Sequence, residues 1–180
     1  MFFDTYGPYD LARDGREIPA KQPDMWAEIR AHSKQYDYPE KGLESAIGCY
    51  AFGLKNGTNY KPWYIGMTVA KRGFRGEILQ PHKLAHYNTV VGSKKGTPVM
   101  FLFPLLTGNW HFSRDRGDSV PLVRWVEKML FGIALTRNPE CRNQRDTKFL
   151  RNVEVRGVFN SRQPGRSSEA MQAVRSMLGA

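Results

Sequence analysis

The chain has 180 residues, of which 41% are hydrophobic, and a formal net charge of +10. This length fits one domain with small additions at its ends, and the hydrophobic content excludes a disordered chain. Two distant cysteines, Cys49 and Cys141, exclude a CxxC-type zinc site and suit a reducing compartment. The N-terminus has no signal-peptide pattern and no run reaches the ~20 apolar residues of a membrane span, so we expect a cytoplasmic protein without a membrane partner.

The positive charge lies in the middle and at the C-terminal end of the sequence. Residues 1–47 carry 6 Lys and Arg against 9 Asp and Glu, residues 48–136 carry 12 against 4, and residues 137–180 carry 9 against 4. A basic surface of this kind indicates a polyanionic partner.

The first half of the chain predicts one helix and a hairpin. Residues 1–22 are rich in Gly, Pro and Asp, and we expect them to be irregular. Residues 23–36 predict a helix, because Pro and Asp stand at its start. Apolar runs at 46–54 and 60–67 flank an Asn-Gly pair, which is typical of an antiparallel hairpin.

The second half predicts a divided helix, a strand and a long helix. Residues 69–92 are expected to be helical with a break at Pro81. Residues 97–107 predict a strand buried on both faces, with Pro104 at a bulge or at its end.

The most regular helical pattern covers residues 119–138, with Ser119 as the expected N-cap and Asn138-Pro139 as the stop. Residues 153–159 are strand-like, and residues 167–178 predict a terminal helix capped by Ser167 or Ser168.

This order of elements predicts an α+β fold in which three strands carry helices on both sides. We expect an N-terminal extension with one helix at 1–45, a core at 46–145, and a basic C-terminal appendage at 146–180 that ends in a helix. The appendage is either a DNA-reading element or a structural cap.

Glu127 interrupts the apolar stripe of the 119–138 helix. It shares that stripe with Val123, Leu130 and Ala134, and burying an unpaired carboxylate is costly. Two interpretations remain open: an ion pair with Arg124, or a carboxylate at the rim of a cleft that holds a divalent cation.

Tyrosines and histidines are the other candidates for chemistry. Tyr50 and Tyr64 would approach each other across the hairpin, although tyrosines are common in strands. His82 and His86 are four residues apart, without the glutamate or third ligand of a zinc site. One of them suits a general base near neutral pH, and the other fits a surface residue.

The words Gly-Cys-Tyr (48–50) and Tyr-Ile-Gly (64–66), followed by a basic helix, a helical glutamate and an asparagine, resemble a GIY-YIG nuclease domain. The resemblance covers residues 46–145. It implies a three-stranded antiparallel sheet flanked by helices, which agrees with the order above. It also implies hydrolysis of nucleic-acid phosphodiesters with one divalent metal ion, Mg²⁺ or Mn²⁺.

The resemblance assigns roles to particular residues. Tyr50 and Tyr64 would line the active site, Glu127 would be the metal ligand, and Asn143 would support the site or touch the phosphate. We take His82 as the candidate base or phosphate contact.

The resemblance also implies an arginine on the first helix after Gly66, which would stabilise the charge that develops on the scissile phosphate. Glu77 occupies the position where this arginine is expected, so two nearby arginines are candidates. Arg75 is nearest to the expected distance from Gly66, and Arg72 is the alternative. The remaining predicted nucleic-acid contacts are Lys83, Lys94, Lys95 and Arg145.

The sequence thus predicts a stand-alone endonuclease acting on single- or double-stranded DNA, in restriction, defence or mobile elements. The alternatives are a nucleic-acid-binding module of the same fold without catalysis, and an RNA-binding protein of other ancestry.

Overall fold

The computed structural model of the chain describes residues 2–34, 42–142 and 168–178. The chain divides into two units, residues 1–143 and 144–180. The second unit has one described helix, α6 (Glu169–Leu178), and the hydroxyl of Ser168 caps it by accepting a hydrogen bond from the Met171 N–H (3.3 Å), as predicted. The strand-like residues 153–159 lie outside the described residues.

The predicted hairpin and third strand form three adjacent strands of the sheet in the first unit. These strands are β3 (Gly48–Asn56), β4 (Asn59–Thr68) and β5 (Thr97–Leu106). β3 lies between the other two and is antiparallel to both, with Phe52 opposite Tyr64 on β4 and Met100 on β5. Pro104 is neither a bulge nor an end, because β5 continues past it to Leu106.

The sheet has five strands, so the prediction of three was wrong. β1 (Phe2–Phe3) and β2 (Tyr6–Asp10) pair antiparallel with the outer edge of β5, where irregular chain was expected. They cover an edge that would otherwise expose its backbone hydrogen-bonding groups. The Gly-Pro pair of β2 lies at a register shift, which is where an irregular strand tolerates such residues.

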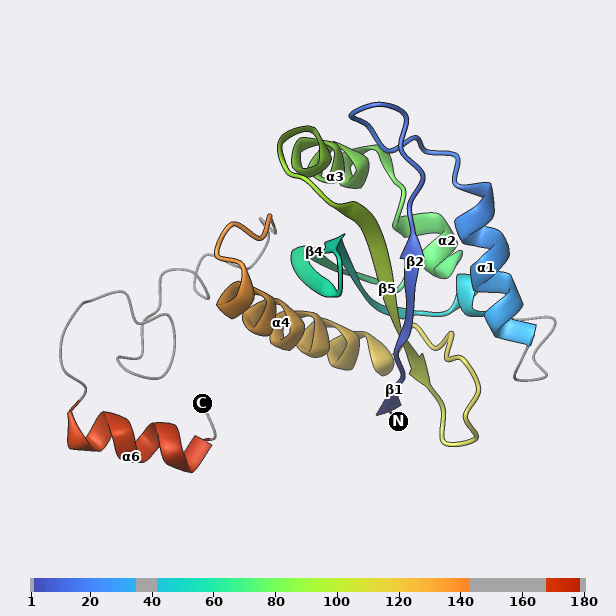
Figure 1. The fold of residues 1–180 in the computed structure, drawn as a ribbon. Coiled ribbons are helices and arrows are strands. Elements are labelled where there is room, and N and C mark those ends of the chain that lie inside the picture. Colours follow the sequence, from blue (N-terminus) through green and yellow to red (C-terminus); the bar gives the residue numbers. More distant parts are fainter. Residues whose placement is uncertain (1, 35–41, 143–167, 179–180) are drawn as a thin grey trace. The chain divides into compact units, whose positions relative to one another are not determined.

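Helices cover both faces of this α+β sheet (Figure 1). One face packs on α1, a short 3₁₀ helix, α2 and α3, whose bounds are Pro23–Lys34, Leu43–Ser45, Gly73–Glu77 and Pro81–Ser93. Pro81 begins α3, so the predicted division of this helical region is confirmed. The other face packs on α4 (Ser119–Arg137), mainly through Val123 against Cys49 and Leu105.

The ends of α4 differ slightly from the prediction. Ser119 is the first helical residue and not the N-cap, and its hydroxyl donates to the carboxylate of Asp115 (2.9 Å). The backbone N–H of Gly117 also donates to this carboxylate (2.8 Å), and such bonds hold the pKa of Asp115 below its usual value. The helix ends at Arg137, as predicted.

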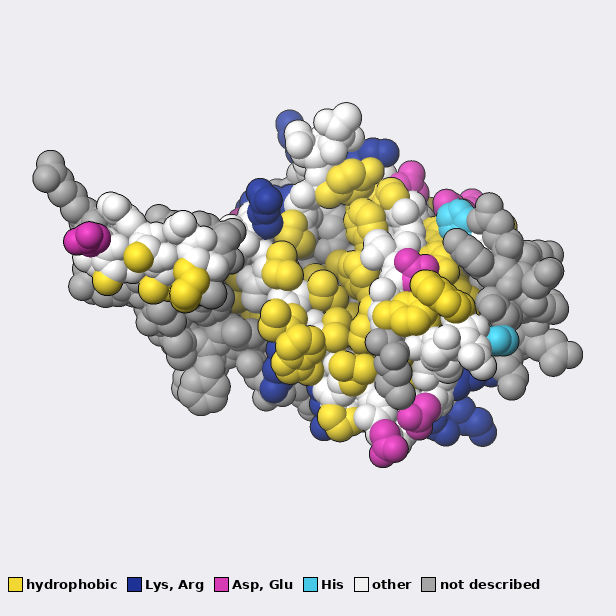
Figure 2. All heavy atoms as spheres, turned by 90° about the horizontal axis from the view of Figure 1, so that it is seen from below, with side chains coloured by type: hydrophobic (Ala, Val, Ile, Leu, Met, Phe, Trp, Pro, Cys, Tyr) yellow, Lys and Arg dark blue, Asp and Glu magenta, His cyan; other side chains and the backbone are white. Residues whose placement is uncertain are grey.

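The outer face of α4 is apolar. Trp125, Met129 and Ile133 lie one helical turn apart and are each at least half exposed, and Figure 2 shows hydrophobic side chains gathered on this side. No helix in the described ranges is both long enough and apolar enough to cross a bilayer.

Gly73 and Gly57 provide a matched test of the packing of α2. Both have left-handed backbones, with φ of +55° and +59°, but a Cβ at Gly73 would overlap the backbone of Ser45, whereas one at Gly57 would meet nothing within 4 Å. Gly57→Ala should lower the free energy of unfolding by about 1–2 kcal/mol, the cost of a left-handed alanine. Gly73→Ala adds an overlap with fixed backbone and should cost about 2–5 kcal/mol in total. Urea denaturation measures both, and equal losses would contradict the packing.

Candidate active site

The hairpin brings Tyr50 and Tyr64 together on the sheet face that packs against α3. Their ring centroids are 6.2 Å apart with an angle of 22° between the planes. Tyr64 also stacks on His86 of α3 (5.6 Å, 23°) and meets the edge of Tyr87 (5.7 Å, 75°). Four aromatic side chains from two strands and one helix therefore form one cluster.

Packing explains why the third residue of Tyr-Ile-Gly is a glycine. Gly66 is the β4 partner of Tyr50, and the ring of Tyr50 lies so close over it that a Cβ at this position would overlap the ring. The absence of a side chain at Gly66 therefore allows Tyr50 to take this orientation beneath the Tyr64 cluster.

Lys83 holds the hydroxyl of Tyr64. Its Nζ donates to the Tyr64 oxygen at 2.7 Å and lies 3.6 Å from a carboxylate oxygen of Glu77, and the lysine and glutamate side chains are 13% and 18% exposed. Gln80 also donates to Glu77 (3.1 Å). An ammonium group can only donate, so the Tyr64 oxygen is the acceptor and its own proton must point elsewhere.

His86 is held in its neutral form. Burial lowers the pKa of its imidazole, and the positive charges of Arg142, Lys83 and His82 lower it further. A neutral imidazole beside Tyr64 is able to accept a proton at neutral pH. His82, the histidine we chose from the sequence, is exposed on the first turn of α3, and its catalytic role stays a prediction.

Two members of the cluster are buried phenols. The hydroxyls of Tyr50 and Tyr87 have no hydrogen-bond partner of good geometry among the described residues. Burial raises the pKa of each well above its usual value, and Tyr64 and Glu77 raise it further. Both are therefore neutral, with an O–H group able to donate.

Glu127 lies on α4, which covers the opposite face of the sheet. It is partly buried on α4, and its charge contributes to the raised pKa of both Tyr50 and Cys49, for which burial is the larger cause. The Cys49 thiol is buried and donates to the Val123 carbonyl (3.4 Å), so it behaves as a core residue. Within the described residues, no group of three or more His, Cys, Asp or Glu side chains is placed to hold a metal ion.

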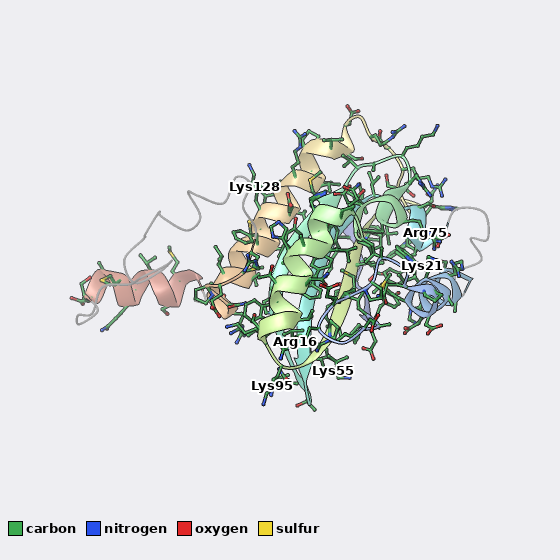
Figure 3. All side chains as sticks on the ribbon, turned by 90° about the horizontal axis from the view of Figure 1, so that it is seen from above. Arg16, Lys21, Lys55, Arg75, Lys95 and Lys128 are labelled. Atoms are coloured by element: carbon green, nitrogen blue, oxygen red, sulfur yellow. The ribbon has the colours of Figure 1, made fainter. Side chains whose placement is uncertain are left out.

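The arginine candidates of α2 lie away from the tyrosines. Arg75 points to the α1 side (Figure 3), where its guanidinium is 3.5 Å from Glu44 and 4.8 Å from the centre of the Trp26 ring. Arg72 is exposed at the start of α2. A catalytic role for either stays a prediction.

The predicted nucleic-acid contacts are spread over the surface. Lys94 pairs with Glu140 (3.0 Å), and Lys95 lies with Lys55 and Arg16 at the far end of α3 (Figure 3). Asn143 and Arg145 lie outside the described residues.

Two site residues were missed in the sequence. Lys83 was expected only as a contact with nucleic acid, and Arg142 was not singled out within the Arg-rich region 137–166, which was expected to follow the nucleic-acid backbone. Lys83 and His86 are three residues apart and border the buried stripe of α3, so helical periodicity could have shown that they lie side by side. No local signal marks Arg142, because the β4 strand that its backbone contacts is far away in sequence.

Comparison of the chain with protein-family models, curated proteins and solved structures finds no match. The resemblance to GIY-YIG nucleases therefore depends on the residues themselves.

Replacing Gly66 tests the contact with Tyr50. Gly66→Ala should lower the free energy of unfolding by about 1–3 kcal/mol, because the ring must move to admit the methyl group. Gly132→Ala is the control, because a Cβ there meets nothing within 4 Å on α4, and it should stabilise by about 0.5–1 kcal/mol. Urea denaturation with near-ultraviolet circular dichroism measures both effects, and an unchanged aromatic signal in Gly66→Ala would argue against the contact.

The lowered pKa of His86 makes stability depend on pH. The unfolded chain binds a proton near pH 6.5 and the folded chain only at lower pH, so stability should be lost as the pH falls through 6.5. His86→Gln removes the imidazole that binds this proton. The free energy of unfolding of the wild type, relative to His86→Gln, should fall between about pH 7.5 and about pH 5.5. A parallel pH dependence of the two proteins would show that the imidazole is unperturbed.

Proposed function

We propose that the chain is a metal-dependent endonuclease of GIY-YIG type that hydrolyses DNA phosphodiester bonds. The observation that carries this proposal is the contact between the two sequence motifs, Gly-Cys-Tyr and Tyr-Ile-Gly. The ring of Tyr50 from the first motif lies on Gly66 of the second, and Tyr64 stacks beside Tyr50 and accepts a hydrogen bond from Lys83. This packing supports the proposal, because it places the side chains of both motifs at one site.

The fold supports the same proposal. In the sheet, β3 lies between β4 and β5; along the chain, α2 and α3 connect β4 to β5, and α4 follows β5. β1, β2 and α1 add to this core from its N-terminal side.

The site contains groups that phosphodiester hydrolysis needs. Neutral His86 would take the proton of the attacking water, directly or through the Tyr64 hydroxyl that it stacks on. Lys83 supplies positive charge beside Tyr64, where negative charge grows on the phosphate oxygens as water attacks.

The carboxylates fit a magnesium or manganese ion that is bound mostly through water and substrate. Mg²⁺ is commonly held by one or two carboxylates together with phosphate oxygens, and both Glu127 and Glu77 act on Tyr50. Glu127 would be the ligand, in the role that the resemblance to GIY-YIG nucleases implies for it. When bound, such an ion neutralises charge on the phosphate and makes a water molecule more acidic.

Cleavage assays test the proposal. Supercoiled plasmid and single-stranded DNA are incubated with the protein in Mg²⁺, Mn²⁺ or EDTA, and we expect cleavage only with metal. Glu127→Ala and Tyr64→Phe should each lower the rate by about 10²-fold or more, the size of effect seen when a group that stabilises or transfers charge is removed.

Glu28→Ala is the matched control, because it removes an exposed carboxylate of α1 and should leave the rate unchanged. Metal-dependent cleavage that survives Glu127→Ala would overturn the assignment of the ligand. DNA binding without any cleavage would instead favour the non-catalytic binding module.

A further inference from the structure

The chain after α4 returns to the outer edge of β4. Asn138 is fully buried, and its side-chain amide donates to the Pro62 carbonyl (2.7 Å). Four residues later, the backbone N–H of Arg142 donates to the Trp63 carbonyl (2.8 Å). These two bonds use adjacent carbonyls of the edge strand and fix Arg142 next to the residue that precedes Tyr64.

Basic groups converge at this point of the edge. Arg142, Lys83 and His82 each act on the imidazole of His86, which stacks on Tyr64. They come from two separate parts of the chain, the start of α3 and the segment after α4. The carboxylate paired with Lys83 is Glu77 (3.6 Å).

Arg142 differs from the other basic residues near the site in its ion pairing. The guanidinium of Arg75 is paired with Glu44, and Lys83 is bonded to Tyr64 and Glu77. The side chain of Arg142 is partly buried and forms no ion pair with a carboxylate of the described residues. Arg142 thus adds a positive charge that no described carboxylate balances, beside Lys83 and His82, and such an excess of positive charge favours an anionic ligand.

We propose that Arg142, together with Lys83 and His86, forms a phosphate-binding site at the edge of β4, and that Arg142 binds the phosphodiester next to Tyr64. A guanidinium presents paired N–H donors that match two phosphate oxygens, which a lysine cannot do. The inference takes its ligand from the proposed nuclease function, but binding at this site does not require cleavage.

Arg142 can be replaced without removing its anchor. The bond to Trp63 comes from the backbone N–H, so a change of side chain leaves it in place. Arg142→Ala removes the charge, and Arg142→Lys keeps the charge while removing the paired donors. Arg30→Ala is the control, because it removes one exposed arginine charge from α1.

The first measurement is an NMR titration of His86 in EDTA. Arg142→Ala should raise the pKa of His86 towards its ordinary value of 6.5, whereas Arg142→Lys and Arg30→Ala should not. A thymidine dinucleotide, which has a single phosphodiester, should shift the His86 ring signals in the wild type and not in Arg142→Ala. An unchanged His86 titration in Arg142→Ala would overturn the placement of the guanidinium.

The second measurement is the affinity for a short oligothymidylate in EDTA, by fluorescence anisotropy at several salt concentrations. Arg142→Ala should weaken binding by about tenfold or more, and Arg142→Lys by less. The log–log salt slope should fall by about 0.7, the value for one phosphate contact on a single strand. A loss no larger than that of Arg30→Ala would overturn the site.

Cleavage separates this inference from the proposed function. Arg142-dependent binding in a protein that cleaves no DNA would support the phosphate site and refute the nuclease. Wild-type cleavage rates in Arg142→Ala would refute the phosphate site and leave the nuclease standing.

Discussion

The ring of Tyr50 lies directly on the backbone of Gly66, and the rest of the site depends on this contact. It requires the β3–β4 register that places these residues opposite each other, because a slip of one residue would turn Tyr50 to the α4 face. Tyr64, two residues before Gly66, then lies on the same face and meets α3. The hairpin register therefore decides whether Tyr64 can be reached by Lys83 and His86.

The charged side chains around Tyr64 are partly buried, and this burial determines how they interact. The Lys83–Glu77 pair is shielded from water, so it holds its geometry better than an exposed pair on the surface. It fixes the direction of the Tyr64 hydroxyl. Burial, together with the positive charges of Arg142, Lys83 and His82, lowers the pKa of His86 and keeps it neutral, and an imidazole must be neutral to take up a proton. Thus α3 places two groups against Tyr64: Lys83, which orients its hydroxyl, and His86, which is able to accept a proton.

Local signals predicted most of the fold and part of the site. The Asn-Gly turn, Pro81 and the Asn138-Pro139 stop placed the hairpin, the division of α2 from α3 and the end of α4. β1 and β2 were missed, because their strand form depends on the edge of β5 and not on their own Gly- and Pro-rich sequence. Tyr50 and Tyr64 were placed together through the hairpin, whereas the approach of Arg142 to Trp63 has no signature in either segment.

Glu77 shows how one residue can change the arrangement of its neighbours. A carboxylate at this place, close to buried tyrosines, needs a cation, and Lys83 on the next helix supplies it. Lys83 is thereby held at the Tyr64 oxygen, while Arg75 on the other side of α2 pairs with Glu44 and packs on Trp26. In the proposed phosphate site, the positive charge then comes from outside α2. The segment after α4, fixed to the edge of β4 by backbone bonds, is the part of the described chain that delivers an arginine to this place.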